Sequence, residues 1–382
     1  MQKKIRMSKK LHNWQPASIC LMIYDFVVVS ISYFIALWIR FDGKFSLIPF
    51  ISLIGLISGG VISIQENIEF FKELNKDGKN IRGTLVNLGY SLLKEDKESL
   101  HLALAYELFQ TSILVHDDII DKDNTRRGKE TIHYRNECHY TKDSITNRKH
   151  LSNSIALCMG DYGLFQANKV ISDSYYNDSN LPKVLSYFNE TVLKTIRGEL
   201  LDVITPFESK YDIIDKDELE KDIMEIYRLK TAHYTIIGPL STGMILAGAD
   251  QSKLNDIEKL GEKIGIAFQI QDDILGIYSD ETGKVKGSDI KEAKQTILYT
   301  YTYNTGYKEE LMKYYGTDNI TDEVIEKVKD IFDASGAKNY ANHLMNELYD
   351  EATNILNNIS WIENEKKEIL EGFIEYLRTR KK

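Results

Sequence analysis

The sequence predicts an all-α protein. From Asn67 onward, apolar residues recur at helical spacing in segments separated by short polar loops, and no convincing run of alternating apolar and polar residues indicates a strand. Only five prolines occur, and none lies between Pro49 and Pro182. Because proline breaks helices, this long stretch suits long helices. With 382 residues, 43% of them apolar, the chain can bury a sizeable core.

Charge and cysteine content exclude several classes of protein. The net charge of −9 argues against a nucleic-acid binder, which would normally be basic. Anionic ligands remain compatible with it, because bound metal ions reverse the local field. The three cysteines are odd in number and form no CxxC pair, so we expect free thiols in a reducing compartment.

The first 65 residues differ from the rest. A basic start is followed by Ala17–Ile39, where Asp25 is the only charge, and an uncharged run covers Phe45–Ile64. About 20 apolar residues are needed to cross a bilayer, so a membrane hairpin is expected, with the basic end in the cytoplasm. The second run could instead be a buried helix, which would leave the orientation open. We therefore divide the chain into a membrane anchor, 1–65, and a helical domain expected on the cytoplasmic side, 66–382.

Two apolar segments have further features. Met7–Phe50, with its "ALWIRFDGK" pattern, resembles the N-terminal membrane segment of polysaccharide-biosynthesis nucleotide-sugar dehydratases, although no catalytic motif of that family follows. This resemblance suggests a fused or borrowed anchor. Tyr234–Ala249 is also apolar, but it is short and interrupted by glycine and proline, so we expect a buried core helix there.

A first acidic cluster follows an apolar helical run. Asp117 and Asp121 are four residues apart and share one helix face, and Gln110 lies two turns earlier on that face. Asp118 and Asp123 add to the negative charge. Two carboxylates one turn apart repel each other unless a cation lies between them. Hard oxygen ligands at this spacing suit Mg²⁺, which commonly binds one or two carboxylates together with substrate phosphates.

A second acidic cluster, in "FQIQDDILG", contains Asp272 and Asp273, with Gln269 one turn earlier. One such cluster would most simply be a solvated helix end. Two clusters that each follow a strongly apolar segment favour two metal sites instead.

Basic residues complement these clusters. They are Lys79, Arg82, Arg126, Arg127, Lys230, Lys284 and Lys294. Arginine forks bind phosphate oxygens in pairs, and lysine binds them as a point charge. The combination predicts a polyphosphate held between Mg²⁺ and cationic side chains, with Arg126 and Arg127 binding phosphate rather than pairing with the carboxylates. The chain contains neither a P-loop motif nor a Rossmann glycine motif.

Several of these motifs, in this order, resemble those of the trans-isoprenyl diphosphate synthases of the polyprenyl synthetase family. "GKNIRG" (78–83) resembles the family's GKxxRP motif, with Gly83 where proline is usual. "DDIID" with "RRG" resembles its first aspartate-rich motif, and "FQIQDDILG" its second. "GELLDV" (198–203) and "LKT" (229–231) match motifs between them.

The resemblance implies an isoprenoid synthase-type helical bundle around a central cavity, usually in a homodimer. It implies that isopentenyl diphosphate condenses with an allylic diphosphate with the help of three Mg²⁺ ions. The metal ligands would be Asp117, Asp121 and Asp272, supported by Asp118 and Asp273. Arg126, Lys230 and Lys284 would contact the allylic diphosphate, and Lys79, Arg82, Gln110 and Arg127 would bind isopentenyl diphosphate. Thr231 and Gln269 would line the reacting carbon chain.

Product length is expected to depend on the residues one turn before Asp117. In the family, a large aromatic side chain there stops elongation at C15, whereas this chain has Ser112 and Ile113. We therefore predict a product of C20 or longer, with geranylgeranyl diphosphate favoured. Phe109 and Tyr106, deeper along the same helix, are the alternative floor.

Parts of the sequence are compatible with three other functions. A class I terpene cyclase would normally have a different second motif and would need no isopentenyl site. A non-catalytic partner subunit tends to lose one acidic motif, and both are present here. A membrane protein of surface-polysaccharide assembly is suggested only by the first 50 residues. Finally, we expect the basic tail Arg378–Lys382 to be solvated, with a tail that folds over the active site as the alternative.

Overall fold

The computed structural model describes residues 64–380, except 97, 141–146, 208–215, 280–286 and 318. The expected membrane runs Ala17–Ile39 and Phe45–Ile64 lie outside these residues, apart from Ile64. Within the described ranges, none of the helices is long and apolar enough to cross a bilayer. The boundary between 1–65 and 66–382 stays a prediction.

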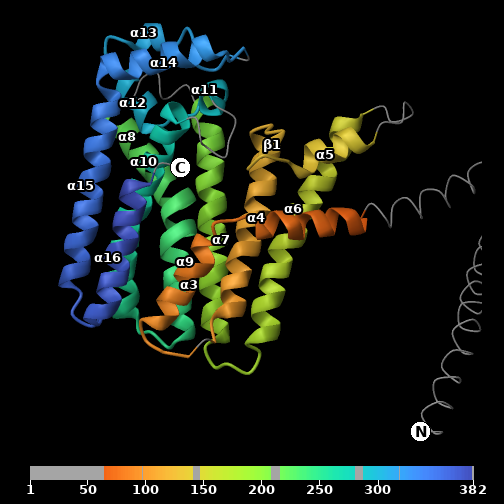
Figure 1. Cartoon of the computed structure of the whole chain (residues 1–382), viewed down its shortest axis with the longest axis vertical. Coiled ribbons are helices and arrows are strands. Elements are labelled where there is room, and N and C mark those ends of the chain that lie inside the picture. The colour runs from red at the N-terminus through yellow and green to blue at the C-terminus, as the bar shows by residue number, and fades with distance from the viewer. Residues whose placement is uncertain are drawn as a thin grey trace, which may run out of the picture. The chain divides into compact units, whose positions relative to one another are not determined.

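The described chain is almost entirely helical, which confirms the predicted fold class (Figure 1). A helix over residues 64–76 comes first. The later helices are α3 (Ile81–Ser91), α4 (Leu100–Ile120), α5 (Ile132–His139), α6 (Arg148–Ser174), α7 (Leu181–Ile204), η1 (Thr205–Phe207), α8 (Lys216–Ile226), η3 (Tyr227–Ile237), α9 (Gly238–Leu246), α10 (Gln251–Tyr278), α11 (Ser288–Lys291), α12 (Ile297–Tyr303), α13 (Lys308–Leu311), α14 (Asp322–Ser335), α15 (Ala337–Asn358) and α16 (Asn364–Thr379).

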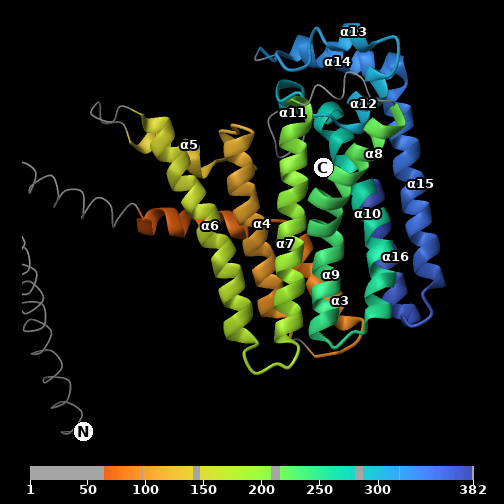
Figure 2. The same cartoon turned by 180° about the vertical axis from the view of Figure 1, so that it is seen from behind.

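The long helices form a bundle. Helices α4, α6, α7, α10 and α15 run lengthwise, while α13 and α14 cross one end (Figures 1 and 2). Helix α4 packs on α6, and α10 packs on both η3 and α15. Helix η3 also packs on α7. The two aspartate motifs are therefore carried by α4 and α10, and η3 lies against the second of these helices.

Helix α4 illustrates why the sequence forms this bundle. Leu102, Tyr106 and Phe109 recur at helical spacing and are fully buried. The helix ends immediately before Asp121, whose backbone N–H still bonds to the carbonyl of Asp117. The apolar face anchors the helix in the core, and its last turn carries the acidic cluster.

Glycine allows α7 to approach η3 closely. A Cβ atom at Gly198 would lie only 2.4 Å from the backbone nitrogen of Lys230. No larger residue fits this contact without displacing the backbone. The "GELLDV" and "LKT" segments are thus in contact because residue 198 is glycine.

Two differences from the sequence analysis concern local structure. Two-residue strands β1 (Thr125–Arg126) and β2 (Lys129–Glu130) form a hairpin, which is too short to show alternation in the sequence. Arg127 and Gly128 both have positive φ at its turn, as a tight hairpin requires. The expected core helix at Tyr234–Ala249 is confirmed as buried, but its first residues continue the π-helix η3 before α9 begins.

Candidate active site

The first aspartate motif lies at the C-terminal end of α4. Asp117, Asp118, Asp121 and Asp123 are all buried, with exposed fractions of 4–7%. Carboxylates removed from water in this way need cationic or hydrogen-bonding partners. The partners come from the β1–β2 hairpin, from η3 and from the segment that precedes α12.

Arg126 pairs directly with this motif. Its Nη2 lies 2.8 Å from Asp117 Oδ2 and 3.5 Å from Asp123 Oδ2, and its Nε donates to Asp118 Oδ1. Burial alone would lower the pKa of Arg126, but the carboxylates of Asp117 and Asp118 raise it overall. The expectation that Arg126 would not pair with these carboxylates was therefore wrong. A buried guanidinium so close to three carboxylates is more stable in ion pairs than alone.

Two lysines complete the cationic side of the first motif. Lys294 Nζ lies 2.9 Å from Asp121 Oδ2, and Lys230 Nζ lies 3.8 Å from Asp117 Oδ1. Burial opposes the charge of Lys230, but Asp202 and Glu199 raise its pKa overall. Lys284 lies outside the described residues, and its role stays a prediction.

Two acidic residues of the "GELLDV" segment join the site, although sequence reasoning gave them no role. Glu199 Oε2 and Asp202 Oδ2 lie 2.9 Å and 2.6 Å from Lys230 Nζ. They are three residues apart on α7 and therefore face the same lysine. The spacing within the motif was a signal that could have identified both.

Two hydrogen bonds hold Asp273 of the second motif, and within the described part of the chain no cation pairs with it. Gln269 Nε2 donates to Asp273 Oδ1 over 2.8 Å, and the hydroxyl of Tyr227 donates to Asp273 Oδ2. Thr231 Oγ1 donates to Gln269 Oε1 over 2.5 Å, so three of the predicted residues are connected. Burial raises the pKa of Asp273 to about 8, while the bonds from Tyr227 and Gln269 oppose that rise.

The C-terminal segment reaches the second motif. Arg380 forms an ion pair with Asp272, donates to Gln271 Oε1 over 3.0 Å and stacks over Phe268. Its side chain is only 8% exposed. The expectation of a solvated tail was therefore wrong at Arg380. A run of basic residues does not reveal in the sequence that a distant helix offers an aromatic ring and a carboxylate.

A second group of cations belongs to the predicted isopentenyl site. Arg82 Nη2 donates to Thr235 Oγ1 over 2.7 Å, and its guanidinium lies 3.8 Å from the centre of the Tyr234 ring. Burial, followed by the nearby Arg126 and Arg82, lowers the pKa of Arg127. Burial raises the pKa of Asp272, and the positive charges of Lys79 and Arg82 are among those that oppose this rise. Lys79 and Arg82 therefore lie near the second motif. Gln110, the remaining residue of the predicted isopentenyl site, is half-buried on α4.

Gly83 stands where the family motif has proline, and a hydrogen bond to α4 holds its backbone in place. Its backbone N–H donates to Glu107 Oε1 over 2.6 Å, and a Cβ atom there would lie 3.2 Å from the same oxygen. Glu107 is buried on α4. The contact fastens the first turn of α3, next to Arg82, to α4.

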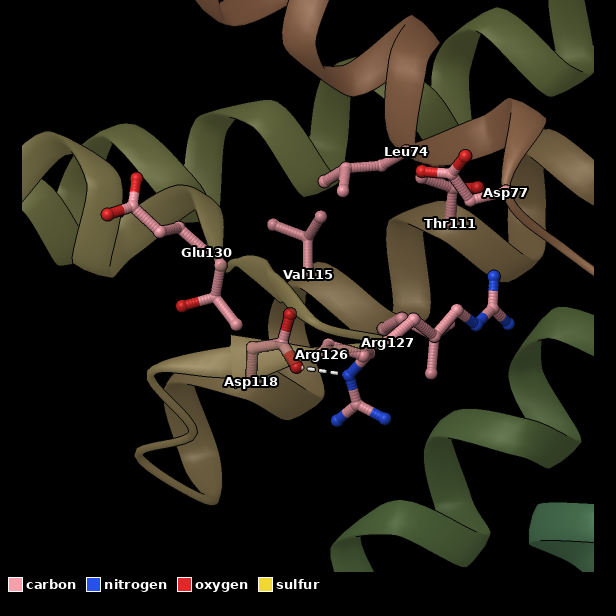
Figure 3. Close-up of a pocket in the computed structure, with 10 residues that line it drawn as sticks. Leu74, Asp77, Thr111, Val115, Asp118, Arg126, Arg127 and Glu130 are labelled. Carbon is pink, nitrogen blue, oxygen red and sulfur yellow. Dashed lines mark hydrogen bonds and ion pairs between the residues drawn. The ribbon is translucent and has the colours of Figure 1, made fainter. Parts of the chain in front are cut away.

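The arginines of the hairpin diverge. Figure 3 shows the Arg126 side chain directed to Asp118, while the Arg127 side chain leaves the hairpin in another direction. Beside them lies a cavity of about 30 Å³, lined by Thr111, Val115 and neighbouring residues. It has room for water but not for a substrate. Adjacent arginines thus serve two different parts of the site.

The residues predicted to set product length lie on two faces of α4. Ile113 and Phe109 share the face of Asp117, because they precede it by four and eight residues. Ser112 faces α6 instead, where a Cβ atom at Gly163 would lie 2.3 Å from Ser112 Oγ.

A buried aromatic cluster lies two turns below Asp117. Phe109 packs edge-on against Phe188 of α7 and Tyr234 of η3, and Tyr106 packs against Phe109 and Phe188. Both Phe109 and Tyr106 are fully buried. The chain-length role of Ser112 and Ile113 stays a prediction, and the cluster gives the alternative floor a structural basis.

The donor set fits magnesium. Asp117, Asp121 and Asp272 offer only carboxylate oxygens, the hard ligands that Mg²⁺ prefers. Each of them is paired with a cation, namely Arg126, Lys294 or Arg380. Among the residues that the structure describes, no three acidic, histidine or cysteine side chains are arranged as a ready metal site. Metal binding would thus exchange one cation for another at each carboxylate.

The family model described as "Polyprenyl synthetase" matches residues 66–332, which include both aspartate motifs. The chain belongs to the polyprenyl synthetase family. It is a trans-prenyltransferase, an enzyme class whose substrates are isopentenyl and allylic diphosphates.

Named relatives of this polyprenyl synthetase make products of different lengths. It is 30% identical to the farnesyl pyrophosphate synthase of Candida albicans, over 83% of this chain and 91% of that one. It is 28% identical to the geranylgeranyl diphosphate synthase of Sulfolobus acidocaldarius, over 80% and 87% of the two chains. It is 29% identical to the geranylfarnesyl diphosphate synthase of Aeropyrum pernix, over 80% and 91%. These names span C15 to C25, so they leave the product length of this polyprenyl synthetase open.

A solved structure has the same fold. The geranylgeranyl pyrophosphate synthase of Corynebacterium glutamicum, complexed with isoprenyl diphosphate and magnesium, matches with a TM-score of 0.76. The two sequences are 25% identical, and the match covers 83% of this chain and 91% of that one. The all-α isoprenoid synthase fold of this polyprenyl synthetase is thereby confirmed.

Proposed function

We propose that this prenyltransferase makes geranylgeranyl diphosphate, with Mg²⁺ bound through Asp117, Asp121 and Asp272. The observation that supports the assignment most strongly is the convergence of Arg126, Lys230 and Lys294 on the carboxylates of α4. Cations and carboxylates that share one buried network are suited to bind a diphosphate together with its metal ions. Three Mg²⁺ ions are proposed, as in the family that the sequence motifs resemble, and Asp117, Asp121 and Asp272 are each paired with at least one cation that a metal ion would replace.

The chemistry follows from the placement of charge. Bound Mg²⁺ would neutralise charge that develops on the leaving diphosphate. Lys230, Arg126 and Lys284 would bind the same diphosphate as its bond to the allylic C1 carbon breaks, since preorganised charge is commonly the largest catalytic contribution. Lys79, Arg82, Arg127 and Gln110 would hold isopentenyl diphosphate so that its C4 carbon attacks the allylic cation. A proton then leaves C2 of the isopentenyl unit, most simply to the released diphosphate.

The carbon chain would extend along α4 past Ile113. Apolar side chains on this face would exclude water from the allylic cation, with Thr231 and Gln269 beside the reacting carbons. The cluster around Phe109 and Tyr106 would end the space below Asp117, at a depth of about 12 Å for eight residues of helix. A C20 product fits a floor that lies two turns down, rather than one turn down, from the first motif.

Product chromatography tests this proposal directly. The purified chain is incubated with isopentenyl diphosphate, Mg²⁺ and, in separate reactions, dimethylallyl, geranyl or farnesyl diphosphate. Geranylgeraniol is expected after dephosphorylation. A product that stops at farnesol would contradict the C20 assignment alone. Cyclic hydrocarbons formed without isopentenyl diphosphate would indicate a terpene cyclase, and the absence of any product would indicate a non-catalytic subunit.

Chain length can be tested within the same assay. Phe109→Ala removes a buried aromatic side chain from the face of Asp117 and should lengthen the product. Ser112→Phe would collide with Gly163 and should mainly destabilise the α4–α6 contact. A shorter product from a stably folded Ser112→Phe variant would instead indicate that residue 112 limits the length of the product.

A homodimer is also proposed. Leu193, Ile196, Leu200 and Ile204 form an exposed apolar stripe along α7, and Phe207 of η1 continues it with 88% of its surface exposed. A contiguous apolar face of this kind is typical of a subunit interface. Light scattering should give a dimer for the native chain and a monomer for Leu200→Glu. Ile369→Glu changes an exposed apolar residue on α16 and is the matched control.

Membrane attachment completes the proposal. The apolar runs within 1–65 would anchor the catalytic domain at the cytoplasmic face of a membrane. Full-length protein should then remain with the membrane fraction after a high-salt and alkaline wash and be released by detergent. Recovery of the full-length chain in the supernatant after either wash would contradict the anchor and leave the enzymatic assignment unaffected.

A further inference from the structure

Tyr227 connects three elements of the site although no motif includes it. It is the first residue of the π-helix η3 and is only 5% exposed. Its hydroxyl accepts the backbone N–H of Ile297, the first residue of α12, over 2.8 Å. The same hydroxyl donates to Asp273 Oδ2 on α10. One oxygen atom therefore joins η3, α10 and the start of α12.

The contact on α10 is part of a larger hydrogen-bonded unit. Asp273 accepts a second bond from Gln269, and Gln269 accepts one from Thr231. Tyr227 and Thr231 are four residues apart on η3, and Gln269 and Asp273 are four residues apart on α10. Each helix thus contributes two side chains that are four residues apart, and three hydrogen bonds link all four side chains. In such a unit each side chain restricts the rotation of the next.

The contact with Ile297 also connects Tyr227 to the first aspartate motif, through the short segment that precedes α12. Ile297 follows Lys294 by three residues, and Lys294 Nζ lies 2.9 Å from Asp121 Oδ2. Tyr315 donates to the backbone carbonyl of Lys294 over 3.1 Å, which fixes the near end of this short segment. Tyr227 fixes its far end. The segment 294–297 consequently spans from the second motif to the first.

We propose that Tyr227 is a positioning residue that sets the distance between the two aspartate motifs, by holding Asp273 and the Lys294 segment with one hydroxyl. The inference rests on the proposed roles of the motifs and of Lys294 in binding a diphosphate with Mg²⁺. Tyr227 itself touches neither substrate nor metal. Its effect reaches them through Asp273, which adjoins Asp272, and through Lys294.

The physical basis is the cost of an unpaired buried group. Loss of the hydroxyl leaves the N–H of Ile297 and one oxygen of Asp273 without this partner in a water-excluded place. Both groups would then shift toward other partners. A shift of the Lys294 ammonium or of Asp272 weakens a site that depends on simultaneous contact with both motifs.

The first test uses Tyr227→Phe, which keeps the ring and removes only the hydroxyl. Binding of inorganic diphosphate in the presence of Mg²⁺ is measured by titration calorimetry on the full chain. We expect its Kd to rise about tenfold, and the KM for the allylic diphosphate to rise similarly. The KM for isopentenyl diphosphate, whose proposed ligands lie on none of the three elements that the Tyr227 hydroxyl joins, should change less than twofold.

Tyr340→Phe is the matched control. It removes a tyrosine hydroxyl that donates to a carboxylate, Glu220, over 2.6 Å, away from the motifs. It should lower the melting temperature and leave diphosphate binding unchanged. Equal diphosphate affinity in Tyr227→Phe and the native chain would overturn the proposal. If the native chain itself bound no diphosphate with Mg²⁺, the proposed function would fail instead, so the two failures are distinguishable.

A second pair of variants covers the case in which Tyr227→Phe does not fold. Ile297→Pro removes the N–H that donates to Tyr227, at the first helical position, where proline is well tolerated. Thr296 before it is already extended, with φ −83° and ψ 172°, as a residue preceding proline requires. Ile297→Ala keeps the N–H and loses comparable packing. A Kd for diphosphate that is several-fold weaker in the proline than in the alanine variant supports the proposal, and equal values overturn it.

Discussion

Asp117 and Asp118 on α4 are held by cations, whereas Asp273 on α10 is held by neutral hydrogen-bond donors. Arg126, Lys230 and Lys294 lie around the first motif. Tyr227 and Gln269 hold Asp273. The two motifs therefore differ in what fixes the second aspartate of each adjacent pair: Arg126 pairs with Asp118, whereas Tyr227 and Gln269 donate to Asp273.

The difference teaches how one site can bind metal and remain ordered. A carboxylate paired with a cation can exchange that cation for Mg²⁺ without leaving a buried charge unpaired. A carboxylate held by hydrogen bonds keeps its geometry while its neighbour, Asp272, changes partner. Asp117, Asp121 and Asp272 are thus suited to exchange and Asp273 to alignment, and the following variants test this distinction.

The largest effect is expected from Asp117→Asn. It removes a charge from the predicted metal ligand, and kcat should fall roughly 10³-fold, as for loss of a principal transition-state contact. Asp123→Asn is the matched control, because Asp123 is equally buried and approaches Arg126 but is not a predicted ligand. Incorporation of labelled isopentenyl diphosphate measures both. Similar losses in the two variants would mean that the cluster acts only through its total charge.

A smaller loss, roughly 100-fold in kcat/KM for the allylic diphosphate, is expected from Lys294→Ala. The change removes the ammonium that lies 2.9 Å from the buried Asp121 carboxylate, and loss of one partner of a buried ion pair commonly costs about 3–5 kcal/mol. Lys291→Ala, at an exposed position in the same segment, is the control and should be nearly silent. Steady-state kinetics with each substrate varied in turn gives the comparison. Equal KM values for the native chain and Lys294→Ala would contradict a role for this lysine.

Gln269→Leu tests the hydrogen-bonded motif. Asp273 and Thr231 both lose a partner, which should lower the free energy of unfolding by about 1–3 kcal/mol. Urea denaturation measures it, and kcat should fall by about tenfold in parallel. Thr231→Val in combination with Gln269→Leu should add little, because members of one hydrogen-bonded unit are not independent. Fully additive losses would show that the unit does not act as one.

The smallest effect is expected from Arg380→Ala. Arg380 pairs with an oxygen of Asp272 that Mg²⁺ would also use. Its removal should therefore lower the Mg²⁺ concentration that gives the half-maximal rate by a few-fold. The effect is expected to be small because the Asp272 carboxylate is 40% exposed. Arg378→Ala is the control, since Arg378 pairs with Asp350 instead. An unchanged or higher Mg²⁺ requirement in Arg380→Ala would count against competition at Asp272.

Much of the candidate site could be predicted because its residues form local patterns. Asp117 and Asp121 are one turn apart, so any helix places them together, and the same holds for Gln269 and Asp273. Tyr227 and Arg380 form no local pattern, and the partners that they contact lie more than 40 residues away in the sequence. The ion pairs of Arg126 were missed because the sequence shows opposite charges but not which of them share a buried space.

The sequence by itself determined that the chain is helical, that two acidic motifs end apolar helical runs and that basic residues accompany them. Periodicity and charge are local properties, and they survive in any arrangement of the helices. Only the tertiary structure decided that Ser112 faces α6, that Arg380 reaches Asp272 and that Tyr227 bridges to the start of α12. The reason is physical: such contacts depend on the close approach of particular helices, which glycines such as Gly163 and Gly198 permit and which spacing along the chain does not reveal.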